Sequence, residues 1–144
     1  MAWGTWGDTM SPAIQALKQQ LHNMVDRDKL TQIACDLVNI PSPTGFERPC
    51  ADYIIGRYHA AGIKVLSQVF EEQRSNAIGI LKGDGSGPVL MLNGHMDTSY
   101  RGDEKYLPDK PGYKPKAVID GEWIYGLGIY NMKGALVCYT HAVK

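Results

Sequence analysis

The chain has 144 residues, of which 44% are hydrophobic, and its 15 basic residues balance its 15 acidic ones. This length is enough for one domain with a buried core. The zero net charge gives no reason to expect nucleic acid or an anionic membrane surface as a partner. No apolar run approaches the roughly 18 residues that a membrane span needs.

Residues 1–10 are interpreted as an N-terminal extension, because they lack the basic start and apolar core of a secretory signal. Cys35, Cys50 and Cys138 form an odd, widely spaced set without a CxxC pair. Such a set indicates a reducing, cytoplasmic location rather than a disulfide framework. A structural zinc site built from thiolates is not expected either.

Three helices are predicted in the first part of the chain. Ser11-Pro12 supplies a hydroxyl cap followed by proline at the first helical position, and apolar residues at helical spacing continue to residue 25. A second helix is predicted over 26–40, where Pro41 stops it. A third is predicted over 47–62, with a glycine at its end.

Strand patterns replace the helical ones after residue 62. Residues 63–70 and 76–81 favour strands, and 88–93 is continuously apolar, as expected of a strand covered on both faces. Residues 99–115 are rich in proline, glycine and charge, which predicts a long surface loop. A short hairpin is predicted over 117–125, around an Asp-Gly turn.

A last helix is predicted from Met132 to Lys144, without a glycine, asparagine or proline stop. We therefore expect a chain that is cut within a helix. Helices followed by strands and a covering helix predict an α/β fold, with helices packed on a mixed sheet. An unfinished last helix would leave part of that sheet uncovered and prone to association.

His95 and Asp97 are the first candidates for chemistry. They follow the apolar segment 88–93 and stand two residues apart, so both side chains can leave one face at the carboxyl end of a strand. A carboxylate beside an imidazole fixes its tautomer and makes it a better metal ligand. The alternative, which spacing alone favours, is a core histidine near a surface aspartate. Gly94 argues against that alternative, because glycine permits a close approach of backbone or ligand.

Other features are expected to be structural. The glycines at 126 and 128 lack the third glycine of a dinucleotide fingerprint and predict a turn. Lys133, at the start of the last helix, could contact an anion but is expected to be solvated. Cys138 has apolar neighbours and is expected to be a small core residue. No GxSxG elbow occurs, which disfavours a serine hydrolase.

Two stretches together resemble the M20 metallopeptidases, which include acetylornithine deacetylase, succinyl-diaminopimelate desuccinylase and glutamate carboxypeptidase. They are GHMDT at 94–98 and, after an Asp-Gly pair, YGLGIYNMKG at 125–134; the loop over 41–47 matches as well. The resemblance covers about Leu30 to Lys144. It implies a zinc-exopeptidase-like fold in which residues 11–144 form the N-terminal portion of a catalytic domain.

The resemblance implies roles for three residues. The histidine of the family's GHxD motif binds one of two zinc ions, a role that would fall to His95. The aspartate of that motif orients the histidine, which makes Asp97 the candidate catalytic residue. An aspartate in the family's GxGxxDMKG run bridges both metals, and this chain has Asn131 there. The family also tends to have a cis peptide bond after this position.

Asn131 offers one neutral carbonyl oxygen where a carboxylate would offer two charged ones. A second zinc ion should therefore bind more weakly. A subgroup with one metal, a decayed pseudoenzyme and an enzyme that compensates elsewhere are all consistent with the substitution.

We therefore expect a zinc-dependent amidohydrolase that acts on N-acyl amino acids or small peptides, in which a metal-bound water attacks the amide carbonyl. In the family, further ligands, a catalytic glutamate and a lid domain that usually forms a homodimer lie downstream, so the 144-residue chain alone is expected to be inactive. A second hypothesis is a non-catalytic pseudoenzyme domain that binds a ligand or partner. A third is an incomplete gene product without a role of its own.

Overall fold

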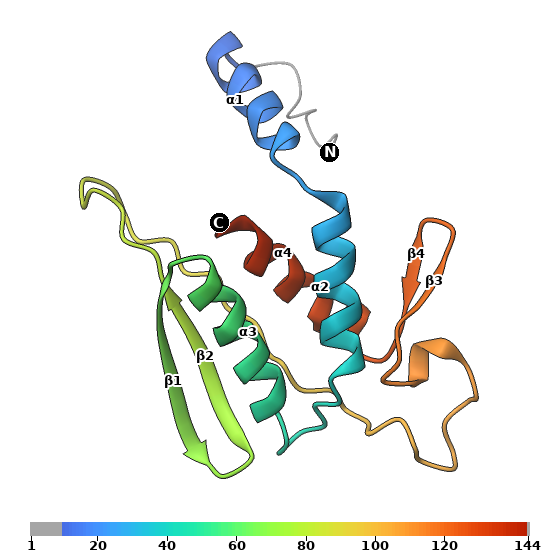
Figure 1. Ribbon diagram of the computed structural model, residues 1–144. Helices are drawn as coiled ribbons and strands as arrows, with labels where there is room; N and C mark the ends of the chain where they lie inside the picture. The colour runs from blue at the N-terminus through green and yellow to red at the C-terminus, as the bar shows by residue number, and fades with distance from the viewer. Residues whose placement is uncertain (1–9, 144) are drawn as a thin grey trace, which may run out of the picture.

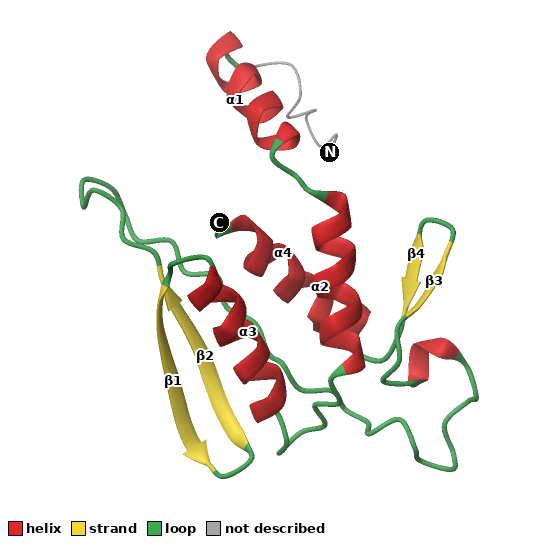
Figure 2. Cartoon of the chain, viewed as in Figure 1, coloured by secondary structure: helices red, strands yellow, loops and turns green. Residues whose placement is uncertain are grey.

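The computed structural model describes residues 10–143, which form four α-helices and two small sheets (Figures 1 and 2). The α/β class predicted from the sequence is confirmed. The predicted N-terminal extension, apart from Met10, lies outside the described residues, as does Lys144. Within the described part, no helix combines the length and apolarity needed to cross a bilayer.

The three N-terminal helices begin within one residue of their predicted starts. Helix α1 (Pro12–Asn23) starts after Ser11, whose Oγ accepts the N–H of Ile14. Helix α2 (Arg27–Asn39) starts after Asp26, whose carboxylate accepts the N–H of Lys29. Helix α3 (Arg48–Ala60) follows the predicted loop. None of the residues of α1 is buried, and Figure 1 shows this helix standing apart from the others.

Both described sheets are two-stranded and antiparallel. Strand β1 (Lys64–Glu71) pairs with β2 (Arg74–Ile80), and α3 packs against this pair. Strands β3 (Val118–Asp120) and β4 (Trp123–Tyr125) form the predicted hairpin. The expectation of a mixed sheet is therefore wrong for the described residues, in which parallel pairing occurs as an isolated bridge between residues 43 and 98.

The prediction of a strand over residues 88–93 is also wrong. Val89, Leu90 and Met91 are 95%, 82% and 79% exposed, and the segment belongs to no ladder. An apolar run favours burial, but a strand also needs neighbours for its N–H and C=O groups. Within residues 10–143 no strand pairs with this segment, because β2 pairs with β1 and β3 with β4. The run is therefore an extended connection.

The core lies where α2, α3 and α4 (Gly134–Ala142) meet. Figure 2 shows α4 beside α2. Apolar side chains from α2, α3 and α4 are buried where the three helices meet. The buried members of this cluster are Ile33, Ala34, Leu37, Cys50, Ile54, Leu136 and Val137. Helix α4 begins two residues later than predicted, after a kinked helical turn, η2 (Ile129–Lys133). One short 3₁₀ turn, η1 (Pro111–Tyr113), interrupts the predicted long loop.

Replacing Leu37 by alanine should lower the free energy of unfolding by about 2–5 kcal/mol, because a fully buried side chain leaves a cavity at the α2–α4 contact. Leu17→Ala, on the exposed face of α1, is the matched control and should change it by no more than about 0.5 kcal/mol. Urea denaturation followed by circular dichroism measures both. Equal losses in the two variants would contradict this position of the core.

Candidate active site

The segment that carries His95 and Asp97 is held in place by the loop after α2. Ser42 accepts the N–H of Thr98 at 2.8 Å through its carbonyl, and its Oγ donates to the carbonyl of Met96 at 2.7 Å. Thr44 donates its N–H to the carbonyl of Thr98 at 3.2 Å. These bonds fix the backbone on both sides of Asp97, so the position of the site depends on the predicted loop 41–47.

The three residues predicted for the site lie together in one hydrogen-bonded row. Asp97 Oδ2 accepts the hydroxyl of Thr44 at 2.7 Å, and Asp97 Oδ1 lies 3.1 Å from His95 Nδ1. The carbonyl of Asp97 is also 3.1 Å from Nδ1. On the other side of the ring, His95 Nε2 lies 3.1 Å from Asn131 Oδ1. The imidazole is thus held between a carboxylate and an amide.

This arrangement constrains the protons of His95. Two acceptor oxygens of Asp97 face Nδ1, so a neutral imidazole carries its proton there. Its Nε2 then directs a lone pair at Asn131 Oδ1, which is also an acceptor. Two facing acceptors are satisfied by a proton on Nε2, by rotation of the amide, or by a cation that both atoms bind. The site is therefore suited to a positive charge between Nε2 and Oδ1.

The distance between these two atoms fits a shared metal ion. Ligands of a tetrahedral zinc ion, each at about 2.0–2.2 Å, lie about 3.3–3.6 Å from each other, slightly farther apart than the observed 3.1 Å. In residues 10–143, however, no group of three or more His, Cys, Asp or Glu side chains could hold a metal. His95 and Asn131 thus fit two positions of one coordination sphere, and both are neutral donors.

The turn that carries Asn131 packs closely against the His95 segment. Gly128 has φ +82°, and a Cβ there would lie 2.7 Å from Thr98 Cγ2. The backbone of His95 donates to Met132 Sδ at 3.3 Å. A Cβ on Gly94 would lie 2.6 Å from Met132 Cε, so the close approach predicted at this glycine is made by a side chain. The Asn131–Met132 peptide bond is cis, as the family resemblance predicts.

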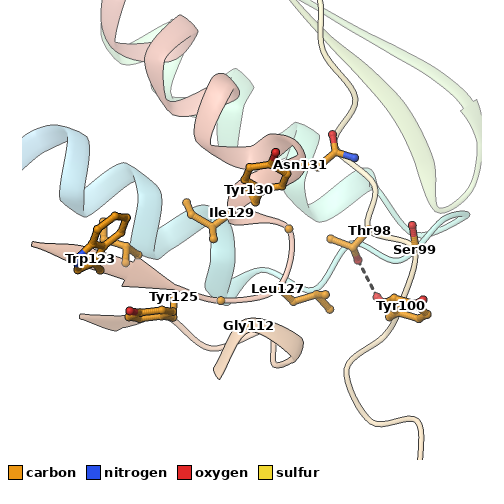
Figure 3. Close-up of a pocket in the computed structure, with 13 residues that line it drawn as sticks. Thr98, Ser99, Tyr100, Gly112, Trp123, Tyr125, Leu127, Ile129, Tyr130 and Asn131 are labelled. Carbon is orange, nitrogen blue, oxygen red and sulfur yellow. Dashed lines mark hydrogen bonds between the residues drawn. The ribbon is translucent and has the colours of Figure 1, made fainter. Parts of the chain in front are cut away.

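A hollow of about 590 Å³ opens beside Asn131. Figure 3 shows Trp123 and Tyr125, from the β3–β4 hairpin, on one side of it and Thr98 and Tyr100 on the other. The Thr98 hydroxyl donates to the carbonyl of Tyr100 at 2.7 Å and thereby holds that side. The hollow is lined by aromatic, aliphatic and neutral polar residues and by no charged one. It therefore offers a ligand apolar and aromatic contacts but no ion pair.

Two expectations for individual residues are wrong. Lys133 is not solvated: it is 1% exposed, and burial lowers the pKa of its ammonium group. Its Nζ donates to the carbonyls of Leu37 and Ile40, both at 2.7 Å. Cys138 is exposed rather than part of the core, because the surface of α4 that it occupies does not face α2 or α3. All three cysteines are free thiols in the structure.

Ser42 and Thr44, the hydroxyl residues that hold the site from the side of Asp97, were not predicted from the sequence. Their signal was present, since both lie in the loop that resembles the M20 proteins. Nothing in the sequence pattern alone assigned their hydroxyls to Met96 and Asp97, because these partners lie more than fifty residues away along the chain.

Three known proteins that resemble the chain bear the name of a hydrolase. It is 31% identical over 119 residues to a protein of Pyrococcus furiosus that bears the provisional name LysW-lysine/LysW-ornithine hydrolase; the match covers 83% of this chain and 31% of that protein. Proteins of the same name in Pyrococcus abyssi and Thermococcus kodakarensis are 31% and 29% identical over 83% of this chain, which corresponds to 30% and 29% of their lengths. No protein-family model matches the chain.

These relatives agree with the class of hydrolase that the sequence motifs predicted. The chain spans less than a third of the length of each of them. The similarity therefore supports an amidohydrolase-type protein.

In the free chain, ¹⁵N NMR at about pH 8, where an ordinary imidazole is neutral, should show the proton of His95 on Nδ1. Asp97→Ala removes the acceptor carboxylate and should convert this single tautomer into a mixture. Signals of His59, an exposed residue of α3, serve as the internal reference and should not move. An unchanged His95 tautomer in the variant would contradict the role of Asp97.

Proposed function

We propose that the chain forms part of the active site of an M20-type zinc amidohydrolase that acts on N-acyl amino acids or small peptides. The observation that carries the proposal is the close approach of His95 Nε2 and Asn131 Oδ1, which lie 3.1 Å apart. Similarity to hydrolases in the same part of the chain supports it. In this proposal His95 and Asn131 bind zinc, and Asp97 orients His95 through Nδ1.

Zinc bound here would polarise the amide carbonyl of a substrate and lower the pKa of a bound water. The residues of the chain prepare the site for that ion. Thr44 holds the Asp97 carboxylate, which holds the proton of His95 away from the metal side of the ring. Asn131 supplies a neutral oxygen, so the positive charge of the ion is compensated less than it would be by an aspartate.

The uncharged hollow beside Asn131 suggests where the amino acid part of a substrate would bind. The names of the relatives refer to lysine and ornithine, whose side chains combine methylene groups with an ammonium group. Aromatic faces such as those of Trp123 and Tyr125 bind both, through apolar contact and cation–π attraction. We propose that this hollow accepts the aliphatic or cationic side chain of the substrate.

The described residues offer one histidine and one amide at the proposed zinc position, and Asp97 is already engaged by Thr44 and His95. Catalytic zinc sites in proteins have three protein ligands and a separate general base. We therefore propose that the 144-residue chain binds zinc weakly and does not hydrolyse amides by itself. A cytoplasmic location and a homodimer of a longer form stay predictions from the cysteine pattern and the resemblance.

A second candidate function follows from Asn131 itself. Without a bridging carboxylate, the same fold could serve as a pseudoenzyme domain that binds a ligand in the uncharged hollow without turnover. The two functions differ in what a restored carboxylate does to metal binding and activity.

Asn131→Asp should raise the zinc association constant by about tenfold or more, because a charged oxygen replaces a neutral one 3.1 Å from His95 Nε2. Isothermal titration with zinc measures the change. Asn76→Asp, at an exposed position of β2, adds the same charge away from the site and is the matched control. Equal affinities in the two variants would show that residue 131 does not contact the metal.

Zinc-loaded chain should show no turnover of N-acetyl amino acids, and Asn131→Asp should not create it, since the Asp97 carboxylate is already engaged by Thr44 and His95. A fluorescent amine assay with and without a zinc chelator detects turnover. Chelator-sensitive hydrolysis by the chain would contradict the proposed inactivity. In a longer form that is active, a loss of activity in Asn131→Asp would identify asparagine as part of a working site.

A further inference from the structure

The side chain of Lys133 is enclosed where α2 ends. Its Nζ donates to the carbonyls of Leu37 and Ile40, which belong to the last turn and the C-cap of α2. Carbonyls at a helix C-terminus lack intrahelical partners and carry the negative end of the dipole. The ammonium of Lys133 therefore satisfies the end of a helix that lies more than ninety residues earlier in the chain.

We propose that Lys133 is the positioning residue of the candidate metal site. Its ammonium fixes the end of α2, whose outgoing loop holds the His95–Asp97 segment, to the turn that carries Asn131. The two zinc donors reach their 3.1 Å separation because both are tied to this one group. The expected change in zinc affinity rests on the proposed function, whereas the expected change in the His95 tautomer does not.

The first connection runs from Lys133 to Asp97. The chain leaves α2 at Ile40 and reaches Ser42, which is fully buried and bonded to the backbone on both sides of Asp97. Two residues further, Thr44 donates to the Asp97 carboxylate at 2.7 Å. A displacement of Ile40 is therefore transmitted to the carboxylate that orients His95.

The second connection runs from Lys133 to Asn131. The N–H of Lys133 donates to the carbonyl of Gly128 at 2.9 Å and closes the turn that contains Asn131. A Cβ at Gly128 would lie 3.3 Å from Lys133 Cδ and 2.7 Å from Thr98 Cγ2, so the lysine stem, the turn and the His95 segment are in close contact. Asn131 cannot keep its place if this stem moves.

The chemistry of the contact requires a lysine. A methionine of similar length would fill the space but leave two buried carbonyls without a donor. The planar fork of an arginine is larger than a compact ammonium, which here directs donors at two carbonyls three residues apart. No carboxylate forms an ion pair with Lys133 among residues 10–143, so the backbone carbonyls are the groups that orient its charge.

Lys133→Met in the full 144-residue chain tests the inference by two measurements. The ¹⁵N signals of the His95 ring should lose the single Nδ1-protonated form, and the zinc association constant should fall about tenfold or more. Ile54→Val, in the core but on α3, is the matched control for a loss of packing. It should leave the tautomer unchanged and alter zinc affinity by less than about twofold.

Ser42→Ala interrupts the first connection without touching the ammonium group, and it decides the question if Lys133→Met does not fold. It should disturb the His95 signals in the same direction. Unchanged His95 signals and zinc affinity in the folded variants would overturn the inference and leave the proposed function intact. Altered His95 signals in a chain whose wild type binds no zinc would overturn the proposed function and support the positioning role.

Discussion

The structure depends on one buried cation at the end of α2. Removing an ammonium group from water is costly, and no buried carboxylate compensates Lys133 within the described residues. The compensation is the C-terminus of a helix, where two short hydrogen bonds and the negative end of the dipole favour a positive charge. Desolvation still lowers the pKa of Lys133, so these contacts offset only part of the cost. Lys133, although its burial is costly, joins two segments of the chain whose positions would otherwise be independent of each other.

Asn131 stands where the M20 resemblance would place an aspartate, and this difference changes the charge around His95. With a second carboxylate at position 131, His95 would lie between two negative groups. Among residues 10–143, Asp97 is instead the one carboxylate in contact with the ring. One side of the imidazole therefore faces a carboxylate and the other a neutral amide.

Local signals were sufficient for most of the fold. Ser11 and Asp26 cap the helices that they were predicted to begin, and the hairpin of residues 118–125 forms around its Asp-Gly turn. Predictions failed where the outcome depends on distant partners. The apolar segment 88–93 has the composition of a buried strand, but among the described residues no strand pairs with it, and a strand cannot form without a ladder.

The candidate site was predicted to a similar extent as the fold, and the predictions that were wrong failed for the same reason. His95, Asp97 and Asn131 were found from motifs, and the structure brings them into one row. Lys133 was expected to be solvated, because charge predicts exposure unless a partner is known. Its partners are backbone carbonyls more than ninety residues away, and carbonyl groups have no sequence signature. The hydroxyls of Ser42 and Thr44 share this property, since their roles are defined by the segment that they meet.

The hydrogen-bonded geometry of the site is formed, but its side chains are still exposed to water. The side chains of His95 and Asp97 are 45% and 32% exposed, so water screens the interaction between them. Exclusion of water strengthens every charge interaction in a catalytic site. The uncharged hollow beside Asn131 gives a substrate a surface from which it could displace water. A bound ligand with an apolar side chain would therefore occupy the hollow and lower the local dielectric constant. The lower dielectric constant would strengthen the hydrogen bonds from Thr44 to Asn131, at the proposed position of the metal ion.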